Sequence, residues 1–340
     1  MPIFEDISLT DSDYFRAVVL YGRNVASYKF ALAESLFTVA SEGKDFVTLE
    51  ELAIPFSDAL CRHLELQDKQ TTARSSRFLD TLRGFNRGEI SSEEKNNATV
   101  QLGFVNVIDA FHVVGPGEVP VRFYQDERSS SNPGIKLTDE LFKMTSEVES
   151  DDLLKENESR WRLVETAWGY NIPQRLITVE YDEKLESFFT TDNHERRQSV
   201  TNAGPALNGY QRGKCFYCNR QIHIETWTLR EERAEVDHFF PHVLQRKGDI
   251  DVDLDQAWNL VLACNKCNGS SEKRDLCPDI SYVEDLYKRN EHLIRSHHPL
   301  RESIIARTGK REPERRKFLQ TCYNMAKLSL VHSWKTIRVI

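Results

Sequence analysis

Cys215-Phe216-Tyr217-Cys218 and its counterpart Cys264-Asn265-Lys266-Cys267 form two C-x-x-C pairs that decide how the second half of this chain is interpreted. Each pair lies in a segment typical of turns, and a gap of two residues lets both sulfurs of a tight turn reach one ion. Two such pairs supply the four thiolates of a tetrahedral structural zinc site. We therefore expect the four cysteines to hold one Zn²⁺ and the surrounding domain to fold only with the metal bound.

Other interpretations of the cysteines fit the sequence less well. No thioredoxin-like βαβ pattern surrounds either pair, which disfavours a redox motif. The total of seven cysteines is odd, which argues against a secreted disulfide framework and favours metal ligation in a reducing compartment. The remaining thiols, Cys61, Cys277 and Cys322, are interpreted as buried or incidental residues.

A group of polar residues lies between and beside the two pairs. The segment 234–240 alternates as a strand that ends at Asp237-His238, and Pro241 stops it. The segment 258–263 predicts a second strand, and Asn268 follows where a helix is expected to begin. The order of strand, loop, strand and helix predicts a ββα unit whose open ends the zinc would hold together.

These motifs resemble the zinc-ribbon HNH endonucleases, which belong to the His-metal finger nucleases. The resemblance covers residues 215–268, and its motifs occur in the order and spacing of that family. The matching residues are the two cysteine pairs, Glu235-Val236-Asp237-His238-Phe239-Phe240-Pro241, Trp258-Asn259-Leu260-Val261-Leu262 and Asn268.

The resemblance implies a role for each polar residue. His238 would be the general base, and a neutral histidine suits proton abstraction near pH 7. Asp237 and Asn268 would bind one catalytic Mg²⁺ or Mn²⁺, for which oxygen ligands are suited. Asn259 would hold the loop and orient the histidine, although an asparagine before an apolar strand is by itself more often a turn or cap residue.

The sequence departs from the family after the last asparagine. The family commonly carries a basic residue three positions later, whereas here the basic residues Lys273 and Arg274 come two positions further on. They are our candidates for contacts with substrate phosphate. His242 is a spare candidate for a metal ligand or for a group that supports the ligands, but an exposed polar loop residue is the favoured interpretation. The acidic loop at 249–255 is assigned no metal binding from the sequence.

The whole chain of 340 residues predicts an α+β protein with three parts. Residues 1–200 form an α-rich recognition or partner domain, residues 205–280 the HNH nuclease domain, and residues 281–340 a basic helical extension. Within the first part we expect a helix from Ser12 to about Ala40 with a break near Gly22. The sequence Thr48-Leu49-Glu50-Glu51 predicts a helix start in which hydroxyl and carboxylate cap each other's backbone amides.

Two strands, 119–124 and 135–137, are expected to follow these helices. This order is compatible with a winged-helix-like part that reads DNA, or with a scaffold that docks a partner, and the second is favoured because fold analogy alone does not give function. The acidic segment 138–165 is interpreted as a solvated helix face, with DNA mimicry or docking of a basic partner as alternatives.

The formal charge of −8 is unusual for a protein that binds nucleic acid by itself. A DNA-binding surface must therefore be local. Its candidate sources are the stretch 74–87 and the basic residues near the C-terminus, namely Arg301, Arg307, Lys310, Arg311, Arg315, Arg316 and Lys317.

The leading hypothesis is a metal-dependent DNA endonuclease. The resemblance implies a restriction or anti-phage nuclease of bacteria, with DNA as substrate and a partner protein or accessory ATPase as further possible partners. The alternative is a zinc-stapled DNA- or protein-binding module without catalysis. We expect a cytoplasmic protein that does not contact a membrane, because the N-terminus lacks an apolar signal segment and no apolar run is long enough to cross a bilayer.

Overall fold

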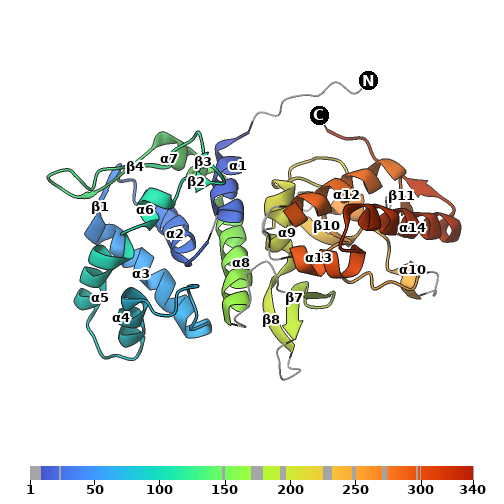
Figure 1. Cartoon of the computed structure of the whole chain (residues 1–340). Coiled ribbons are helices and arrows are strands. Elements are labelled where there is room, and N and C mark those ends of the chain that lie inside the picture. The colour runs from blue at the N-terminus through green and yellow to red at the C-terminus, as the bar shows by residue number, and fades with distance from the viewer. Residues whose placement is uncertain are drawn as a thin grey trace. The chain divides into compact units, whose positions relative to one another are not determined.

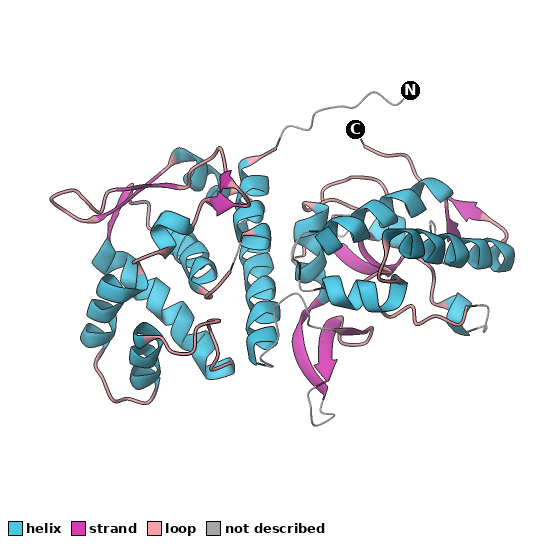
Figure 2. Cartoon of the chain, viewed as in Figure 1, coloured by secondary structure: helices cyan, strands magenta, loops and turns pink. Residues whose placement is uncertain are grey.

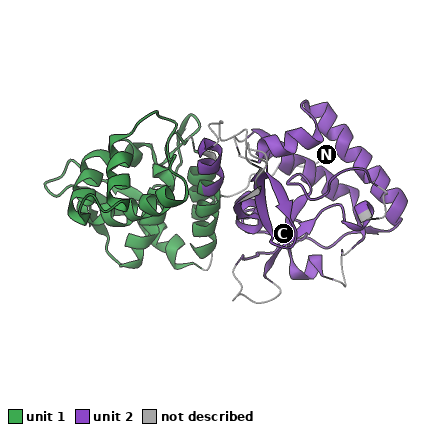
Figure 3. Ribbon diagram, turned by 90° about the horizontal axis from the view of Figure 1, so that it is seen from below, with its two compact units in different colours: residues 1–161 green, residues 162–340 purple. Residues whose placement is uncertain are grey.

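The computed structural model describes residues 9–22, 24–147, 150–169, 179–191, 197–224, 232–246, 250–269, 273, 275–295, 298 and 300–339. Helices and short strands are mixed in these residues, which agrees with the predicted α+β class (Figures 1 and 2). The chain divides into two compact units, Met1–Trp161 and Arg162–Ile340 (Figure 3). The division falls between residues 161 and 162, whereas the sequence analysis ended the first domain at residue 200.

The first unit consists mainly of helices. In chain order its elements are α1 (Asp11–Arg16), the π-helical turn η1 (Ala17–Tyr21), α2 (Tyr28–Ser41), β1 (Phe46–Thr48), α3 (Leu49–Leu66), α4 (Arg77–Asn86), α5 (Ser92–Ala98), the π-helical turn η2 (Thr99–Gly103), α6 (Val107–Ala110), β2 (Val113–Val114), β3 (Gly117–Glu118), β4 (Tyr124–Asp126), β5 (Gly134–Leu137), α7 (Asp139–Ser146) and α8 (Ser150–Gly169).

In this unit the helix start and the helix break expected from the sequence are confirmed, whereas the expected strands are confirmed only in part. Thr48 Oγ1 accepts a hydrogen bond from the Glu51 amide at 3.1 Å, and the Glu51 carboxylate accepts one from the Thr48 amide at 3.0 Å, so α3 begins as predicted. The break near Gly22 separates η1 from α2. The strand expected at 119–124 begins only at its last residue, because Pro120 has no amide to give to a sheet. In the sheet, β5 lies between β1 and β4.

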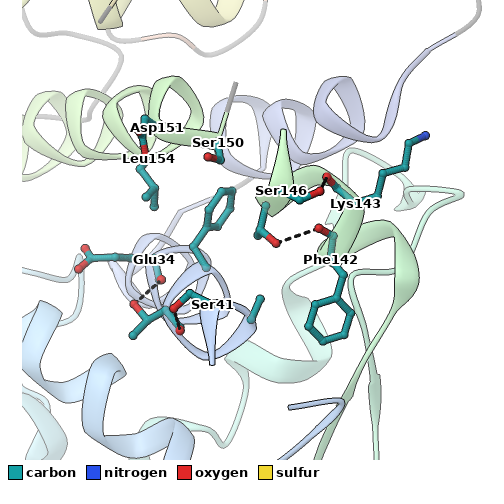
Figure 4. A pocket seen from close by; sticks show the side chains of 12 residues that line it. Glu34, Ser41, Phe142, Lys143, Ser146, Ser150, Asp151 and Leu154 are labelled. Atoms are coloured by element: carbon teal, nitrogen blue, oxygen red, sulfur yellow. Dashed lines mark hydrogen bonds between the residues drawn. The ribbon is translucent and has the colours of Figure 1, made fainter. Parts of the chain in front are cut away.

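A cavity of about 1040 Å³ opens in the first unit among residues of α2, α7 and α8 (Figure 4). Hydroxyl groups line it, including those of Thr38, Ser41 and Ser146. Each of the three donates its hydrogen bond to a backbone carbonyl of its own helix. The hydrogen bonds of these hydroxyls are therefore made within their own helices.

The second unit carries the residues that the sequence selected for chemistry. Its elements are β6 (Glu180–Asp182), β7 (Ser187–Thr191), β8 (Arg197–Asn202), α9 (Ala203–Gln211), β9 (Ala234–His238), α10 (Val243–Arg246), β10 (Leu260–Cys264), α11 (Asn265–Asn268), β11 (Cys277–Pro278), α12 (Ile280–Arg295), α13 (Arg301–Thr308), α14 (Glu312–Leu330) and β12 (Ser333–Trp334). Across the described residues of both units, no helix combines the length and the apolar character needed to span a membrane.

The antiparallel hairpin of β9 and β10 lies in the core of the second unit. Helix α9 contacts both strands, and α12, α13 and α14 contact one another to form a helical layer (Figure 1). Leu286 of α12, Leu319 of α14 and Trp334 of β12 belong to the same buried cluster as the hairpin. Residues 281–340, which we expected to form a helical extension, thus contribute apolar side chains to the core of this unit.

Candidate functional site

Four buried cysteines meet in the second unit. Cys215 and Cys218 come from the turn after α9, Cys264 ends β10 and Cys267 lies in α11. Their Sγ atoms all lie within 4.8 Å of one another, and all four are free thiols. Asn219 shapes the first turn with a φ of 61°, and its amide donates to the Cys215 carbonyl at 3.0 Å. The sequence prediction that the two pairs converge is confirmed.

This group can bind a metal such as zinc. The Sγ atoms of Cys218 and Cys264 are 3.7 Å apart, and Zn–S bonds of ~2.3 Å in a tetrahedron would place two sulfurs ~3.8 Å apart. Cys218 and Cys267 each interact with the Cys215 side chain. This interaction is the largest cause that lowers the pKa of Cys218, and it is also the largest cause that raises the pKa of Cys267. A bound cation would allow all four sulfurs to be thiolates.

The resemblance implies that Asp237 binds the catalytic metal ion and that His238 activates the attacking water. The hairpin places these two side chains apart. In its register Asp237 lies opposite Val261 and His238 opposite Leu260. Side chains alternate along a strand, so Asp237 and His238 point to opposite faces. The hydrogen-bond partners of the two side chains are accordingly different.

Asp237 lies on the face that is closed by Tyr217 and Lys273. The Tyr217 hydroxyl donates to its carboxylate at 2.5 Å, and the Lys273 ammonium donates at 2.9 Å. The same ammonium donates to the backbone carbonyl of His238 at 2.7 Å. Burial is the main reason that the pKa of Tyr217 lies well above its ordinary value, so the hydroxyl stays a donor. The carboxylate therefore already has a cation and a hydroxyl as partners.

Asn268 pairs with Glu235 on that same face of β9. Its side-chain amide donates to the Glu235 carboxylate at 3.0 Å, and the amide of Asn265 donates to the other oxygen at 2.6 Å. Asn268 is the last residue of the one-turn helix α11, whereas we expected a helix to begin there. The amides of Asn265 and Asn268 thus hold Glu235 as a hydrogen-bonded carboxylate.

His238, His242 and Asp255 form a second cluster on the other face. Nε2 of His238 lies 2.7 Å from one oxygen of Asp255, and Nε2 of His242 lies 3.2 Å from the other oxygen. The hydrogen bond with His238 is the main cause that lowers the pKa of Asp255 from its ordinary value. Asp255 comes from the acidic loop to which the sequence assigned no role. One carboxylate among several in that loop has no distinguishing local signal.

Asn259 holds the loop between the strands, as the resemblance implied. Its oxygen accepts from the Phe240 amide at 2.9 Å, and its amide donates to the carbonyls of Phe240 and Leu254, both at 3.1 Å. Arg289 of α12 supports the same region, since it donates to the carbonyls of Ala257, Trp258 and Leu260. Sequence reasoning missed Arg289, because its role exists only where α12 packs on the hairpin.

Lys273, one of the two expected phosphate contacts, has a buried partner within the protein. Lys273 is fully buried and its ammonium is held by Asp237, so it is not available on the surface. Arg274 lies outside the described residues. Among the C-terminal basic residues, Arg315 is buried against Glu291, and Arg316 pairs with Glu284. Arg307, Lys310 and Lys317 are exposed and are the better candidates for a local basic surface.

Comparison with known proteins assigned no family to this chain. No family model matched the chain, and neither the curated proteins nor the solved structures contained a match. The functional interpretation therefore rests on the motifs and on the geometry of the second unit.

Proposed function

We propose that this chain is a metal-dependent DNA endonuclease that hydrolyses phosphodiester bonds. The observation that carries the proposal is the 2.7 Å hydrogen bond between His238 and Asp255 at one end of the β9–β10 hairpin. The opposite end of that hairpin carries Cys264, a member of the four-cysteine group. The HNH resemblance implies this arrangement, in which an oriented histidine lies on a hairpin that also carries a structural metal-binding group. The role in defence against foreign DNA follows from the resemblance alone.

In this proposal the reaction depends on proton transfer to His238. Its Nε2–H donates to Asp255, so Nδ1 is the nitrogen that accepts a proton from the attacking water. The Asp255 carboxylate then stabilises the imidazolium that forms. A positioned base of this kind contributes roughly 10²–10⁴-fold to the rate. Asp255 is thus proposed as a positioning residue, and His238 as the general base.

The catalytic Mg²⁺ or Mn²⁺ would supply positive charge at the scissile phosphate and the leaving oxygen. Asp237 does not fit this ion in the arrangement described, because Lys273 already neutralises its carboxylate, and the Asn268 side-chain nitrogen is held by Glu235. The described residues of the second unit therefore supply no assigned ligands for this cation.

The test is a plasmid-nicking assay on the full-length, zinc-loaded protein with Mg²⁺ or Mn²⁺ and with an EDTA control. His238→Ala should reduce nicking by at least ~10²-fold while the protein keeps its zinc and still unfolds cooperatively. His332→Ala, which removes an exposed histidine, is the matched control. Nicking by a clean His238→Ala preparation at the wild-type rate would refute the mechanism.

The second candidate function is a zinc-stapled binding module without catalysis. The specific observation in its favour is the Asp237–Lys273 ion pair, which fills the position where the resemblance would place a metal. The same preparations separate the two functions. DNA binding without nicking in any divalent cation, and equal behaviour of wild type and His238→Ala, would favour the binding module. In both cases the first unit is proposed to select a DNA feature, a partner protein or an accessory ATPase.

A further inference from the structure

Among the described residues, His238, His242 and Asp255 form a group of metal-ligand side chains in addition to the four cysteines. Their ligand atoms all lie within 4.8 Å of one another. The base chemistry proposed above uses His238 and Asp255 but gives His242 no part. His242 contacts the same carboxylate as His238 but takes no part in that chemistry.

The geometry of the group suits one cation. Both histidines present Nε2 to the same carboxylate, and their ring centroids are 5.3 Å apart with the planes at 68°. The two nitrogens contact different oxygens of one carboxylate, so an ion placed among the three side chains is within reach of all of them. His238 is buried, whereas His242 and Asp255 are half-buried, so the group is open to solvent on one side. Three protein ligands with an open side leave room for water on the ion.

The group is held in place by the surrounding chain. The Asp255 amide donates to Asp253 at 3.0 Å, and the Asp255 carbonyl accepts from the Tyr181 amide at 3.3 Å. His238 is fixed by the hairpin register opposite Leu260. Supports of this kind orient metal ligands before an ion arrives.

The ligand chemistry selects the class of cation. Two imidazoles and one carboxylate suit Zn²⁺ and similar transition-metal ions, whereas Mg²⁺ prefers oxygen ligands. The group contains no sulfur, so an ion bound there is distinguishable from one in the four-cysteine group. It also lies on the face of β9 opposite Asp237, the residue that the resemblance links to Mg²⁺.

We propose that His238, His242 and Asp255 bind a divalent transition-metal cation such as Zn²⁺, and that this cation inhibits the endonuclease. The inhibitory half rests on the proposed function, whereas the binding half does not. When Nε2 of His238 coordinates the ion, the proton of the neutral ring moves to Nδ1. Nδ1 is then a donor and no longer accepts a proton from water, so the base is blocked.

Metal binding is tested by calorimetric titration of Zn²⁺ into the full-length protein that already holds one zinc per chain. Wild type should bind a second equivalent. His242→Ala and Asp255→Asn should each weaken this second binding by at least ~10-fold, while His332→Ala should not. Co²⁺ added in place of Zn²⁺ should give a spectrum without thiolate-to-metal charge transfer. A single equivalent in wild type, or a second one that neither variant weakens, would overturn the proposal.

Inhibition is tested separately in the Mg²⁺-supported nicking assay. Added Zn²⁺ should inhibit wild type, and His242→Ala should need at least ~10-fold more Zn²⁺ for the same inhibition. Wild type that binds the second ion and is not inhibited would overturn the inhibitory half. A chain that never nicks DNA would refute the proposed function, whereas the titration would still decide whether the cation site exists. Unchanged zinc content and melting temperature in each variant show that it has folded.

Discussion

The ammonium of Lys273 lies 2.9 Å from the carboxylate of Asp237, and the two side chains are 1% and 8% exposed. A buried pair of this kind loses much of its attraction to the cost of desolvating both charges. Removing one partner nevertheless destabilises the fold, because the other charge is left buried without a counter-charge. Asp237→Ala is therefore a poor probe of catalysis, since it would leave the Lys273 ammonium buried without a counter-charge.

Lys273→Met should lower the free energy of unfolding by about 3–5 kcal/mol, because it leaves Asp237 buried without its cation. Urea unfolding of the zinc-loaded protein measures the change. Lys266→Met, which alters an exposed lysine in α11, should change the same quantity by less than about 0.5 kcal/mol. If Lys273 occupies the place of a divalent cation, Mg²⁺ should restore part of the lost stability in Lys273→Met and add little to wild type. Equal stability of the two lysine variants would contradict the ion pair.

Cys215→Ala should abolish stoichiometric zinc binding and lower the melting temperature of the second unit, because three thiolates cannot complete a tetrahedral site. Elemental analysis of the dialysed protein and calorimetry measure the two effects. Cys322→Ala removes another buried thiol of the same core and should keep one zinc per chain. A Cys215→Ala protein that still retained one tightly bound zinc would disprove the four-cysteine site.

Asn259→Ala should cost about 3 kcal/mol of unfolding free energy, because it leaves the Phe240 amide and two carbonyls without their hydrogen bonds. It should also reduce nicking, since the loop between the strands carries Asp255. Chemical denaturation and the plasmid assay give the two readouts. Asn324→Ala, at an exposed position of α14, is the control. Stability equal to that control would show that the loop does not depend on Asn259.

The stability of the first unit should fall in mild acid because of His112. Burial, reinforced by the charges of Arg122 and Lys29, lowers the pKa of His112 to about 3 from its ordinary value of 6.5. Its Nε2 accepts a hydrogen bond from the Phe123 amide at 3.0 Å, so the folded state holds the neutral ring. Between these two pKa values the unfolded chain binds a proton that the folded chain does not. Stability is therefore present above pH 6.5 and is lost as the pH falls toward 3.

The contribution of His112 should be up to about 1.4 kcal/mol per pH unit within that window. Calorimetry of wild type and His112→Gln between pH 4 and 7 measures it. The glutamine keeps an acceptor for Phe123 but does not titrate, so the variant should show a shallower decline. Parallel curves for the two proteins would rule out His112 as the source.

Predictions that depend on near neighbours in the sequence agreed with the structure. The Thr48–Glu51 cap, the break near Gly22 and the strand ending at His238 arise from contacts over a few residues or from side-chain alternation. The strand expected at 119–124 is the exception among these local signals, and Pro120 accounts for it. Predictions that depended on which distant residues meet were less successful, as the burial of Lys273 and the partners of Asn268 illustrate.

The sequence by itself determined the mixed class of the fold, the hairpin and the convergence of the cysteine pairs, because repeat spacing and alternation are properties of the local chain. Only the tertiary structure decided that Asp237 and His238 act on opposite faces and that Asp255 is the carboxylate that reaches His238. It also decided that side chains of residues 281–340 are part of the core of the second unit. The physical reason is the same in each case. Burial and pairing of a side chain depend on segments that are far away along the chain, and the sequence does not state which of them pack together.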